Sequence, residues 1–264
     1  MIEFAILGRP RGPPYFLWSL NMNQKITAFL FGLLGTTLLI CSCILALYFR
    51  QSSQQAALYS QLAASASYFD TGEGSLLPER EELYEQNPDM VGWLQIEGTG
   101  IDYPVMQTPN DPNFYLKHNF EKAYSDLGVP YIQEDCDLAA SDNLIIYGHH
   151  IKGQKMFGAL ESYKDKDFYE EHKSIQFDTL TEQAEYEIVA VFKTVAYSSE
   201  GFRYYDFVDA EDEKAFDEYV SKCKEFALYD TGVTAKYGDK LITLSTCEYS
   251  AQNGRLVVVA KKIA

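Results

Sequence analysis

One stretch near the C-terminus reads Leu241-Ile-Thr-Leu-Ser-Thr-Cys247-Glu-Tyr-Ser-Ala-Gln-Asn-Gly-Arg255-Leu-Val-Val-Val259. Its two apolar runs are typical of buried β-strands. The first run ends on a cysteine, and an arginine opens the second. Asn253-Gly254 is a favoured pair for a tight turn between antiparallel strands. We therefore expect a turn that brings Arg255 back toward Cys247.

A second apolar run, Asn143-Leu-Ile-Ile-Tyr-Gly-His149-His150, also ends on reactive side chains. A cysteine thiolate is a good nucleophile, and a histidine can pass a proton to a leaving amine. An arginine stays charged and can hold a developing oxyanion without exchanging a proton. If these strand ends meet, Cys247, His149 and Arg255 form a site for acyl transfer.

Each of these residues also has a plainer interpretation. Free cysteine is often a small buried hydrophobe, so Cys247 could simply pack in a core. Arg255 could be a solvated charge in a turn, and His149 a hydrogen-bonded residue of a Gly-containing loop. The stretch 248–253 after Cys247 contains no large aliphatic side chain. That polar setting, with three reactive residues at strand ends, favours catalysis.

Residues 26–49 contain no charged side chain. A helix of that length crosses roughly 30 Å of hydrocarbon. Arg9, Arg11 and Lys25 precede the segment, and positive charge on that side predicts a cytoplasmic N-terminus, residues 1–25, with the rest of the chain outside. The alternative is a cleaved signal peptide, whose apolar region is usually only about 7–15 residues long. We expect an uncleaved single-pass anchor in the cell membrane.

The chain is acidic, with a formal net charge of −16. Nucleic-acid binders need basic patches, so this composition argues against nucleic acid as a partner. Outside the apolar segment, the cysteines are Cys136, Cys223 and Cys247, and at least one must be a free thiol. Cys136 and Cys223 could form a disulfide or remain buried thiols. The sequence has no CxxC pair and no cluster of histidines, the patterns that would predict a zinc site. We therefore expect no metal and no cofactor.

The segment 50–82 is expected to be an extracellular stalk, partly helical, and residues 83–264 a single catalytic domain. Short strands are predicted at 91–96, 101–106, 129–132, 143–147, 184–197, 241–246 and 256–260. Helices are predicted at 78–86, 156–163 and 209–228. Many short strands with few helices indicate a mostly β barrel or sandwich.

The motifs around the reactive residues resemble those of the sortase family. Thr243-Leu-Ser-Thr-Cys247 with Arg255 is similar to the family's cysteine signature, and Tyr147-Gly-His149 to its histidine motif. Further stretches resemble class B sortases in particular: Asn87-Pro-Asp-Met-Val-Gly-Trp-Leu94, Ile101-Asp-Tyr-Pro-Val105, Tyr115-Leu116, Met156-Phe-Gly158 and Phe168-Tyr169 with His172. The resemblance extends from about residue 83 to the end of the chain.

The resemblance implies a β-barrel of about eight strands with flanking helices, and a membrane-anchored cysteine transpeptidase of Gram-positive bacteria. Cys247 would be the nucleophile, His149 the acid and base, and Arg255 the oxyanion or substrate clamp. Substrate would be a secreted protein with a C-terminal sorting signal, cut after Thr through a thioacyl-enzyme. A peptidoglycan precursor or cross-bridge amine would then receive it. Ser245, Glu248, Tyr147 and Leu116 match substrate-groove positions, and Tyr204-Tyr205 belong either to the groove or to the core.

The chain departs from the class B pattern in several places. His150 stands where members often have Asn, which leaves His149 and His150 both to be considered as the acid and base. Asp111-Pro112 replaces an Asn-containing groove segment, and residues 128–135 are more polar than usual. Two other functions fit the same residues: a cell-wall cysteine peptidase that hydrolyses its acyl-enzyme, and a catalytically inactive anchored binding module.

Overall fold

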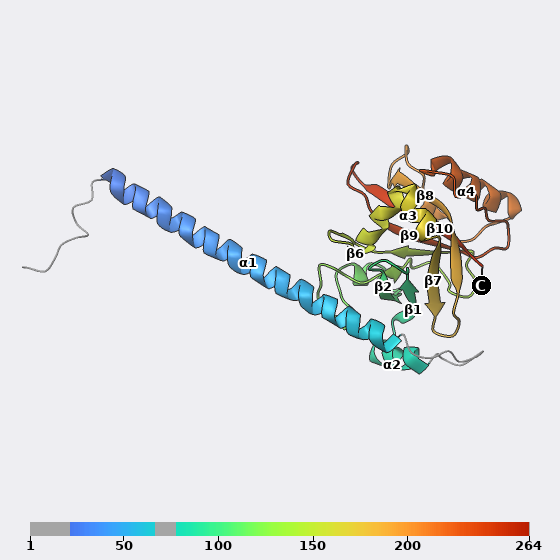
Figure 1. The fold of residues 1–264 in the computed structure, drawn as a ribbon, viewed down its shortest axis with the longest axis horizontal. Helices are drawn as coiled ribbons and strands as arrows, with labels where there is room; N and C mark the ends of the chain where they lie inside the picture. The colour runs from blue at the N-terminus through green and yellow to red at the C-terminus, as the bar shows by residue number, and fades with distance from the viewer. Residues whose placement is uncertain (1–21, 67–77, 264) are drawn as a thin grey trace, which may run out of the picture. The chain divides into compact units, whose positions relative to one another are not determined.

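The computed structural model of the chain describes residues 22–66 and 78–263 (Figure 1). The chain divides into two units, Met1–Ser53 and Gln54–Ala264. Helix α1, Met22–Ala66, supplies the described part of the first unit and continues into the second. Within it, Lys25–Ala64 is long and apolar enough to cross a membrane, since it contains an 18-residue stretch with a mean hydropathy of 2.3. Residues 1–21 of the expected cytoplasmic segment lie outside the described residues.

The last turns of α1 belong to the same unit as the β domain. Tyr59 and Leu62 are buried there, and the Tyr59 hydroxyl donates a hydrogen bond of 2.8 Å to the carbonyl of Gly128. The Tyr59 ring packs edge-on against Tyr103, with centroids 5.3 Å apart. This part of the expected stalk is therefore packed against the domain. Residues 67–77 of that stalk are outside the described residues.

Helix α2, Pro78–Gln86, begins and ends where the sequence predicts. A buried ion pair joins it to the sheet, because Arg80 donates to the Asp178 carboxylate at 3.1 Å. The Arg80 guanidinium also lies over the Trp93 ring, 4.9 Å from its centroid. Removing either partner of a buried pair leaves an uncompensated charge, so substitution of Arg80 or of Asp178 alone should be destabilising.

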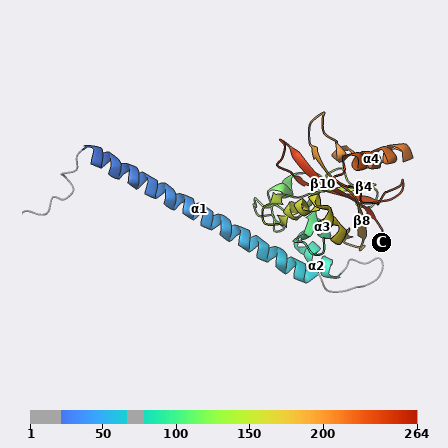
Figure 2. The ribbon, with the colours of Figure 1, turned by 45° about the horizontal axis from the view of Figure 1, so that its top comes forward.

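Eight strands close into a barrel in the order β1-β2-β3-β4-β9-β10-β8-β7 (Figures 1 and 2). They are β1 Met90–Gln95, β2 Asp102–Met106, β3 Tyr131–Ile132, β4 Asn143–Tyr147, β7 Ser174–Thr179, β8 Glu185–Val195, β9 Leu241–Cys247 and β10 Gly254–Lys262. The pairs β2–β3 and β4–β9 are parallel, and the others are antiparallel. The barrel expected from the family resemblance is confirmed, including its strand number.

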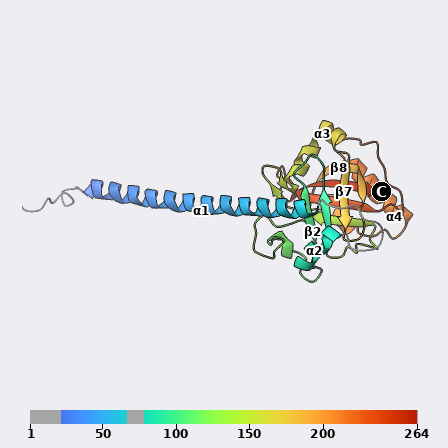
Figure 3. The ribbon, with the colours of Figure 1, turned by 60° about the horizontal axis from the view of Figure 1, so that its bottom comes forward.

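The remaining elements lie between the strands. They are η1 Phe114–Leu116, the small pair β5 His150–Ile151 and β6 Lys155–Met156, η2 Phe157–Lys164, α3 Lys166–Glu171, η3 Tyr204–Asp206 and α4 Glu213–Phe226. Figure 3 shows α3 and α4 outside the barrel strands β7 and β8. The buried residues of α4 follow the i, i+3, i+4, i+7 pattern of one helix face, and this face packs on the barrel. They are Phe216, Tyr219, Val220 and Cys223.

Several boundaries differ from the sequence predictions for local reasons. The helix predicted at 209–228 begins only at Glu213, because the Asp212 side chain caps it by accepting from the Ala215 N–H at 2.8 Å. The carboxylate of Asp209 instead accepts from the Asp142 N–H at 3.1 Å. The helix predicted at 156–163 is a 3₁₀ helix, η2. Strand β7 and helix α3 were not predicted.

Candidate active site

The pairing of β9 with β10 places Cys247 directly opposite Arg255. Directly opposed residues of an antiparallel pair point to the same face of the sheet, with Cβ atoms roughly 4.5–5.5 Å apart. The Glu248 N–H donates to the Gly254 carbonyl at 2.9 Å and closes the connection between the strands. A side chain at Gly254 would put its Cβ 2.3 Å from the Glu248 carbonyl oxygen, so only glycine fits. The expected return of Arg255 toward Cys247 is therefore present.

His149 reaches the same place from the parallel strand β4. Tyr147 is the register partner of Ser245, so His149 and Cys247 each lie two residues beyond a paired position. Two hydrogen bonds extend the pairing past the strand ends: the Gly148 N–H donates to the Ser245 carbonyl at 3.1 Å, and the Thr246 hydroxyl donates to the Gly148 carbonyl at 2.8 Å. Backbone contacts thus fix the histidine segment against the cysteine strand.

The glycine before His149 is required by its neighbour. A Cβ at Gly148 would lie 2.5 Å from the Phe157 ring. Phe157 is the first residue of η2, and its N–H donates to the His149 carbonyl at 2.9 Å. The stretches Tyr147-Gly-His149 and Met156-Phe-Gly158, which follow each other closely in sequence, therefore pack against each other.

The orientation of the His149 ring follows from a single hydrogen bond. Its Nε2 lies 2.7 Å from the carbonyl oxygen of Leu116. A carbonyl can only accept, so Nε2 carries a proton and donates it. In the neutral ring Nδ1 is then the nitrogen with a free lone pair, which makes it the atom able to take up and return a proton.

A cavity of about 610 Å³ brings the predicted residues together. His149, Cys247 and Arg255 all line it, as do Leu116, Tyr147 and Ser245. Glu248 is the one predicted site residue that does not line this cavity. Its carboxylate is buried and bound by Lys164, at 2.6 Å, from the far end of η2.

Tyrosines form much of the cavity wall. Tyr204 is buried and its hydroxyl lies 2.6 Å from the Ser245 hydroxyl, and both Tyr204 and Tyr205 line the cavity. Tyr147 donates to the side-chain oxygen of Gln133, and Tyr131 and Tyr147 pack against each other with centroids 5.7 Å apart. Burial raises the pKa of Tyr131 and of Tyr204 to about 12, so both stay uncharged hydrogen-bonding groups at neutral pH.

Sequence reasoning missed some residues of this wall. Tyr131, Gln133 and Tyr197 line the cavity but were not singled out. The alternation of a strand could have identified two of them. Tyr131 and Gln133 flank the buried Ile132, so their side chains point to the same face. Tyr197 follows β8 with a positive φ of 58°, an unusual conformation for a residue other than glycine.

His150 lies outside the cavity that contains His149. Its ring packs edge-on against Tyr249, with centroids 5.1 Å apart, and its Nδ1 lies 3.8 Å from a Glu161 carboxylate oxygen. Neither of those two buried atoms has a hydrogen-bond partner among the described residues. Of the two adjacent histidines, His149 is the one that lines the cavity together with Cys247 and Arg255.

Cys136 and Cys223 do not pair. Both are free buried thiols, and burial raises the pKa of each to about 12. The Cys136 thiol lies 3.5 Å from the Asn143 carbonyl, to which it donates. Of the cysteines that the structure places in the β domain, Cys247 is thus the one that is partly exposed and lines a cavity.

In a comparison with known protein families, residues 94–263 match the family model described as "Sortase domain". Sortase B of Staphylococcus aureus is 33% identical over 189 residues, which cover 70% of this chain and 75% of that protein. Sortase B of Listeria monocytogenes is 33% identical over 210 residues, 78% of this chain and 81% of that protein. A solved Staphylococcus aureus sortase B–substrate complex is similar with a TM-score of 0.72 and 30% identity, covering 81% of this chain and 98% of that one.

Proposed function

This chain belongs to the sortase family and is a class B cysteine transpeptidase, and from that premise we propose that it attaches secreted proteins to the cell wall. Its substrate is a protein with a C-terminal sorting signal, cut after Thr, and its acceptor is an amine of a peptidoglycan precursor or cross-bridge. One observation supports the proposal most directly: Cys247 and Arg255 are cross-strand partners in the cavity that His149 lines.

Before the first step His149 Nδ1 takes up the proton of the Cys247 thiol, and the resulting thiolate attacks the carbonyl carbon of the substrate Thr. A carbon–sulfur bond forms, and the carbonyl electron pair moves onto oxygen. Arg255 stabilises this oxyanion, because its guanidinium keeps its charge at every relevant pH. When the oxyanion collapses, the carbon–nitrogen bond breaks and His149 gives a proton from Nδ1 to the leaving amine. The substrate remains joined to Cys247 as a thioester.

The second step reverses these roles. The acceptor amine attacks the thioester carbonyl and loses a proton to His149 Nδ1. Arg255 again holds the oxyanion, and collapse breaks the carbon–sulfur bond and returns the Cys247 thiolate. The hydrogen bond from Nε2 to the Leu116 carbonyl supports the proposal, because it holds the imidazole in one orientation while Nδ1 exchanges the proton.

The groove for the sorting peptide runs over Leu116, Tyr147 and Ser245. Tyrosine rings offer apolar surface with little side-chain entropy to lose, and their hydroxyls offer hydrogen bonds to a peptide backbone. The Ser245 hydroxyl is held by Tyr204 at 2.6 Å, and both side chains line the cavity.

A direct test supplies the full chain, in detergent micelles, with fluorogenic peptides that carry Thr-containing sorting motifs. We expect cleavage and a covalent acyl-enzyme that mass spectrometry detects on the wild type and not on Cys247→Ala. Adding an amine nucleophile should yield amide-linked product in proportion to its concentration. Purely hydrolytic product at high amine would instead support a cell-wall peptidase. No acyl-enzyme, together with an unaltered biological role for Cys247→Ala, would support an anchored binding module.

The same proposal places the first residues of the chain in the cytoplasm and the domain outside the membrane, held by α1 as a single span. The basic residues before the apolar segment support this orientation. Protease added to intact protoplasts should digest the β domain and leave a membrane-bound fragment. Protection of the β domain from the protease would indicate the opposite orientation. Release of an intact domain into the medium would indicate a cleaved signal peptide.

A further inference from the structure

Glu248, the residue after the proposed nucleophile, is directed away from the cavity into a network of its own. Its side chain is 6% exposed. One carboxylate oxygen accepts from Lys164 Nζ at 2.6 Å, and the other accepts from the Ser250 N–H at 3.0 Å and from the Ser250 hydroxyl. Adjacent residues at the end of a strand face opposite sides, so Cys247 in the cavity and Glu248 outside it are consistent.

These contacts hold the loop between β9 and β10. The Glu248 carboxylate binds Ser250, and the Glu248 N–H binds the Gly254 carbonyl at 2.9 Å. The Gly254 N–H in turn donates to the Ala251 carbonyl at 3.1 Å. The loop thus begins one residue after Cys247 and ends one residue before Arg255. The Glu248 carboxylate ties its first half, and Lys193 of β8 adds to this tie, because its Nζ lies 3.9 Å from that carboxylate and donates to the Ser250 hydroxyl at 3.2 Å.

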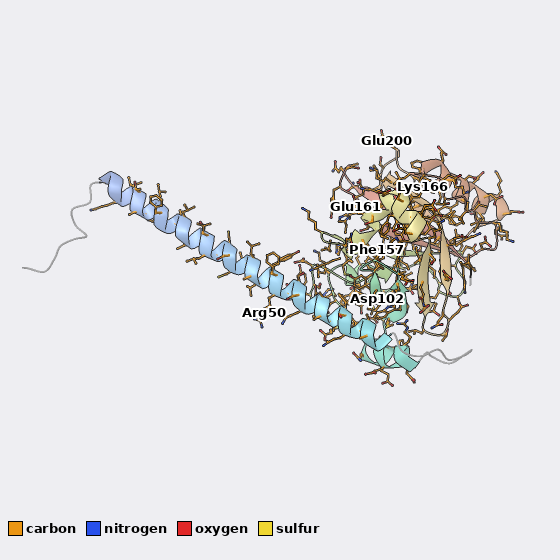
Figure 4. All side chains as sticks on the ribbon, in the orientation of Figure 1. Arg50, Asp102, Phe157, Glu161, Lys166 and Glu200 are labelled. Atoms are coloured by element: carbon orange, nitrogen blue, oxygen red, sulfur yellow. The ribbon has the colours of Figure 1, made fainter. Side chains whose placement is uncertain are left out.

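Lys164 connects this loop to the histidine segment through η2. At the start of η2, the Phe157 N–H binds the His149 carbonyl at 2.9 Å. At its end, Lys164 binds Glu248 and also Glu161, at 2.5 Å. Phe157 and Glu161 are labelled in Figure 4 and lie on the same segment. One short helix therefore contacts the histidine at one end and, through Lys164, the cysteine–arginine loop at the other.

We propose that Lys164 and Glu248 are positioning residues, which keep Cys247 and Arg255 in register with His149, and that Glu248 is not a substrate ligand. The kinetic part of this inference rests on the proposed function. A small displacement of a reacting group suffices for a large loss of rate, about 10²-fold for 1 Å. Loss of the Lys164 contact should therefore lower kcat while the groove, and with it KM, is retained.

The test compares Lys164→Met, Lys164→Arg and Glu248→Gln in the full chain. The control is Lys222→Met, which removes a similar lysine–glutamate pair, 2.6 Å to Glu225, on the exposed surface of α4. Amide hydrogen exchange is measured on peptides that cover residues 248–254, and kcat and KM are measured with a cleavable sorting peptide and an amine acceptor.

We expect Lys164→Met and Glu248→Gln to speed exchange in 248–254 at least tenfold, with the β4 and β8 peptides unchanged. Both should lower kcat by about 10²-fold with KM within threefold. Lys164→Arg should recover most of kcat, and Lys222→Met should match the wild type.

Two results would overturn the inference. Unchanged exchange in Lys164→Met would show that the ion pair does not hold the loop. A raised KM in Glu248→Gln, with wild-type kinetics in Lys164→Met, would make Glu248 a substrate ligand. If the wild type cleaves no peptide, the proposed function fails, and the exchange measurement still decides whether Lys164 and Glu248 hold the loop.

Discussion

Arg255 and Cys247 face each other across the β9–β10 ladder as direct register partners. Because the two backbones are hydrogen-bonded to each other, the separation of the guanidinium and the thiol depends on side-chain rotation alone. In the proposed reaction, an oxyanion at a carbonyl bound to Cys247 would form on the face of the sheet that Arg255 shares. Such preorganised charge is usually the largest electrostatic contribution to an acyl-transfer reaction.

Replacement of Arg255 should therefore affect the chemical step. Arg255→Ala is expected to lower kcat by about 10²–10³-fold, the usual effect of removing an oxyanion donor. Arg255→Lys should recover only part of the loss, because it keeps the charge and loses the planar fork of donors. Steady-state kinetics measure this, with Lys261→Ala on the same strand as a control. A raised KM with unchanged kcat would make Arg255 a clamp for ground-state substrate only.

The two adjacent histidines should differ sharply in effect. His149→Ala is expected to lower kcat by about 10²–10⁴-fold, the range for loss of a general acid and base. His150→Asn should stay within a few-fold of the wild type, because His150 lies outside the cavity and packs edge-on against Tyr249. The pH profile of kcat/KM gives a second measurement: its bell shape should persist in His150→Asn. Loss of the bell shape in that variant would reassign the acid and base to His150.

The apolar runs made most of the barrel predictable. Residues 143–147 are nearly all apolar, and 241–246 combine Leu and Ile with Thr and Ser. Both runs are buried almost throughout, and they form the parallel pair β4–β9. The chain reverses between Cys247 and Arg255 as the Asn253-Gly254 pair indicated, with Asn253 at a positive φ of 56°. Local chemistry therefore predicts this part of the site.

Contacts between distant residues were not predictable in this way. Strand β7 reads Ser-Ile-Gln-Phe-Asp-Thr and alternates, yet its Asp178 is buried by an ion pair with Arg80, far away in α2. Glu248 matched a groove position because it follows Cys247, but Lys164 binds it from 84 residues away. A carboxylate turns toward the available cation, and sequence spacing does not show which lysine the fold brings near.

The packing of Phe157 on Gly148 leads to a prediction of stability. Gly148→Ala should lower the free energy of unfolding by about 1–3 kcal/mol, the cost of overpacking, because the new Cβ would lie 2.5 Å from the ring. Urea unfolding of the full chain in detergent measures it. Gly148→Ala with Phe157→Leu should recover part of the loss, since the smaller side chain frees space. If the losses of unfolding free energy from the two single substitutions simply add in the double variant, the Phe157 ring is not what excludes a side chain at position 148.

Tyr59 should contribute to the stability of the β domain although it lies in α1. Tyr59→Phe removes the hydrogen bond to Gly128 and should cost about 1 kcal/mol. Tyr59→Ala also removes the buried ring and should cost about 3–5 kcal/mol. Near-UV circular dichroism during urea unfolding follows the domain, with Tyr237→Phe, at a half-exposed position, as the control. Equal free energies of unfolding in all variants would show that Tyr59, at the end of α1, does not stabilise the β domain.

The ionised state of Glu248 should make stability depend on pH in the acid range. Burial alone would raise the pKa of Glu248, but the hydrogen bonds from Lys164 and Ser250 outweigh it and lower the pKa from 4.5 to about 2. The folded state therefore favours the carboxylate, so its contribution is complete above the unfolded pKa near 4.5 and is lost as the pH falls toward 2. The shift corresponds to roughly 3 kcal/mol.

Unfolding free energies of the wild type and Glu248→Gln, measured from pH 7 downward, isolate this contribution from that of the other carboxylates. The wild type should be the more stable by a constant amount above about pH 5. The difference should shrink as the pH falls, because a protonated Glu248 resembles the amide that replaces it. Lys164→Met should reduce the pH-dependent difference without abolishing it, since the Lys164 ammonium group and the Ser250 hydrogen bonds both favour the carboxylate. A difference that stays constant down to the lowest pH at which the chain remains folded would mean that packing, and not charge, accounts for the effect of Glu248.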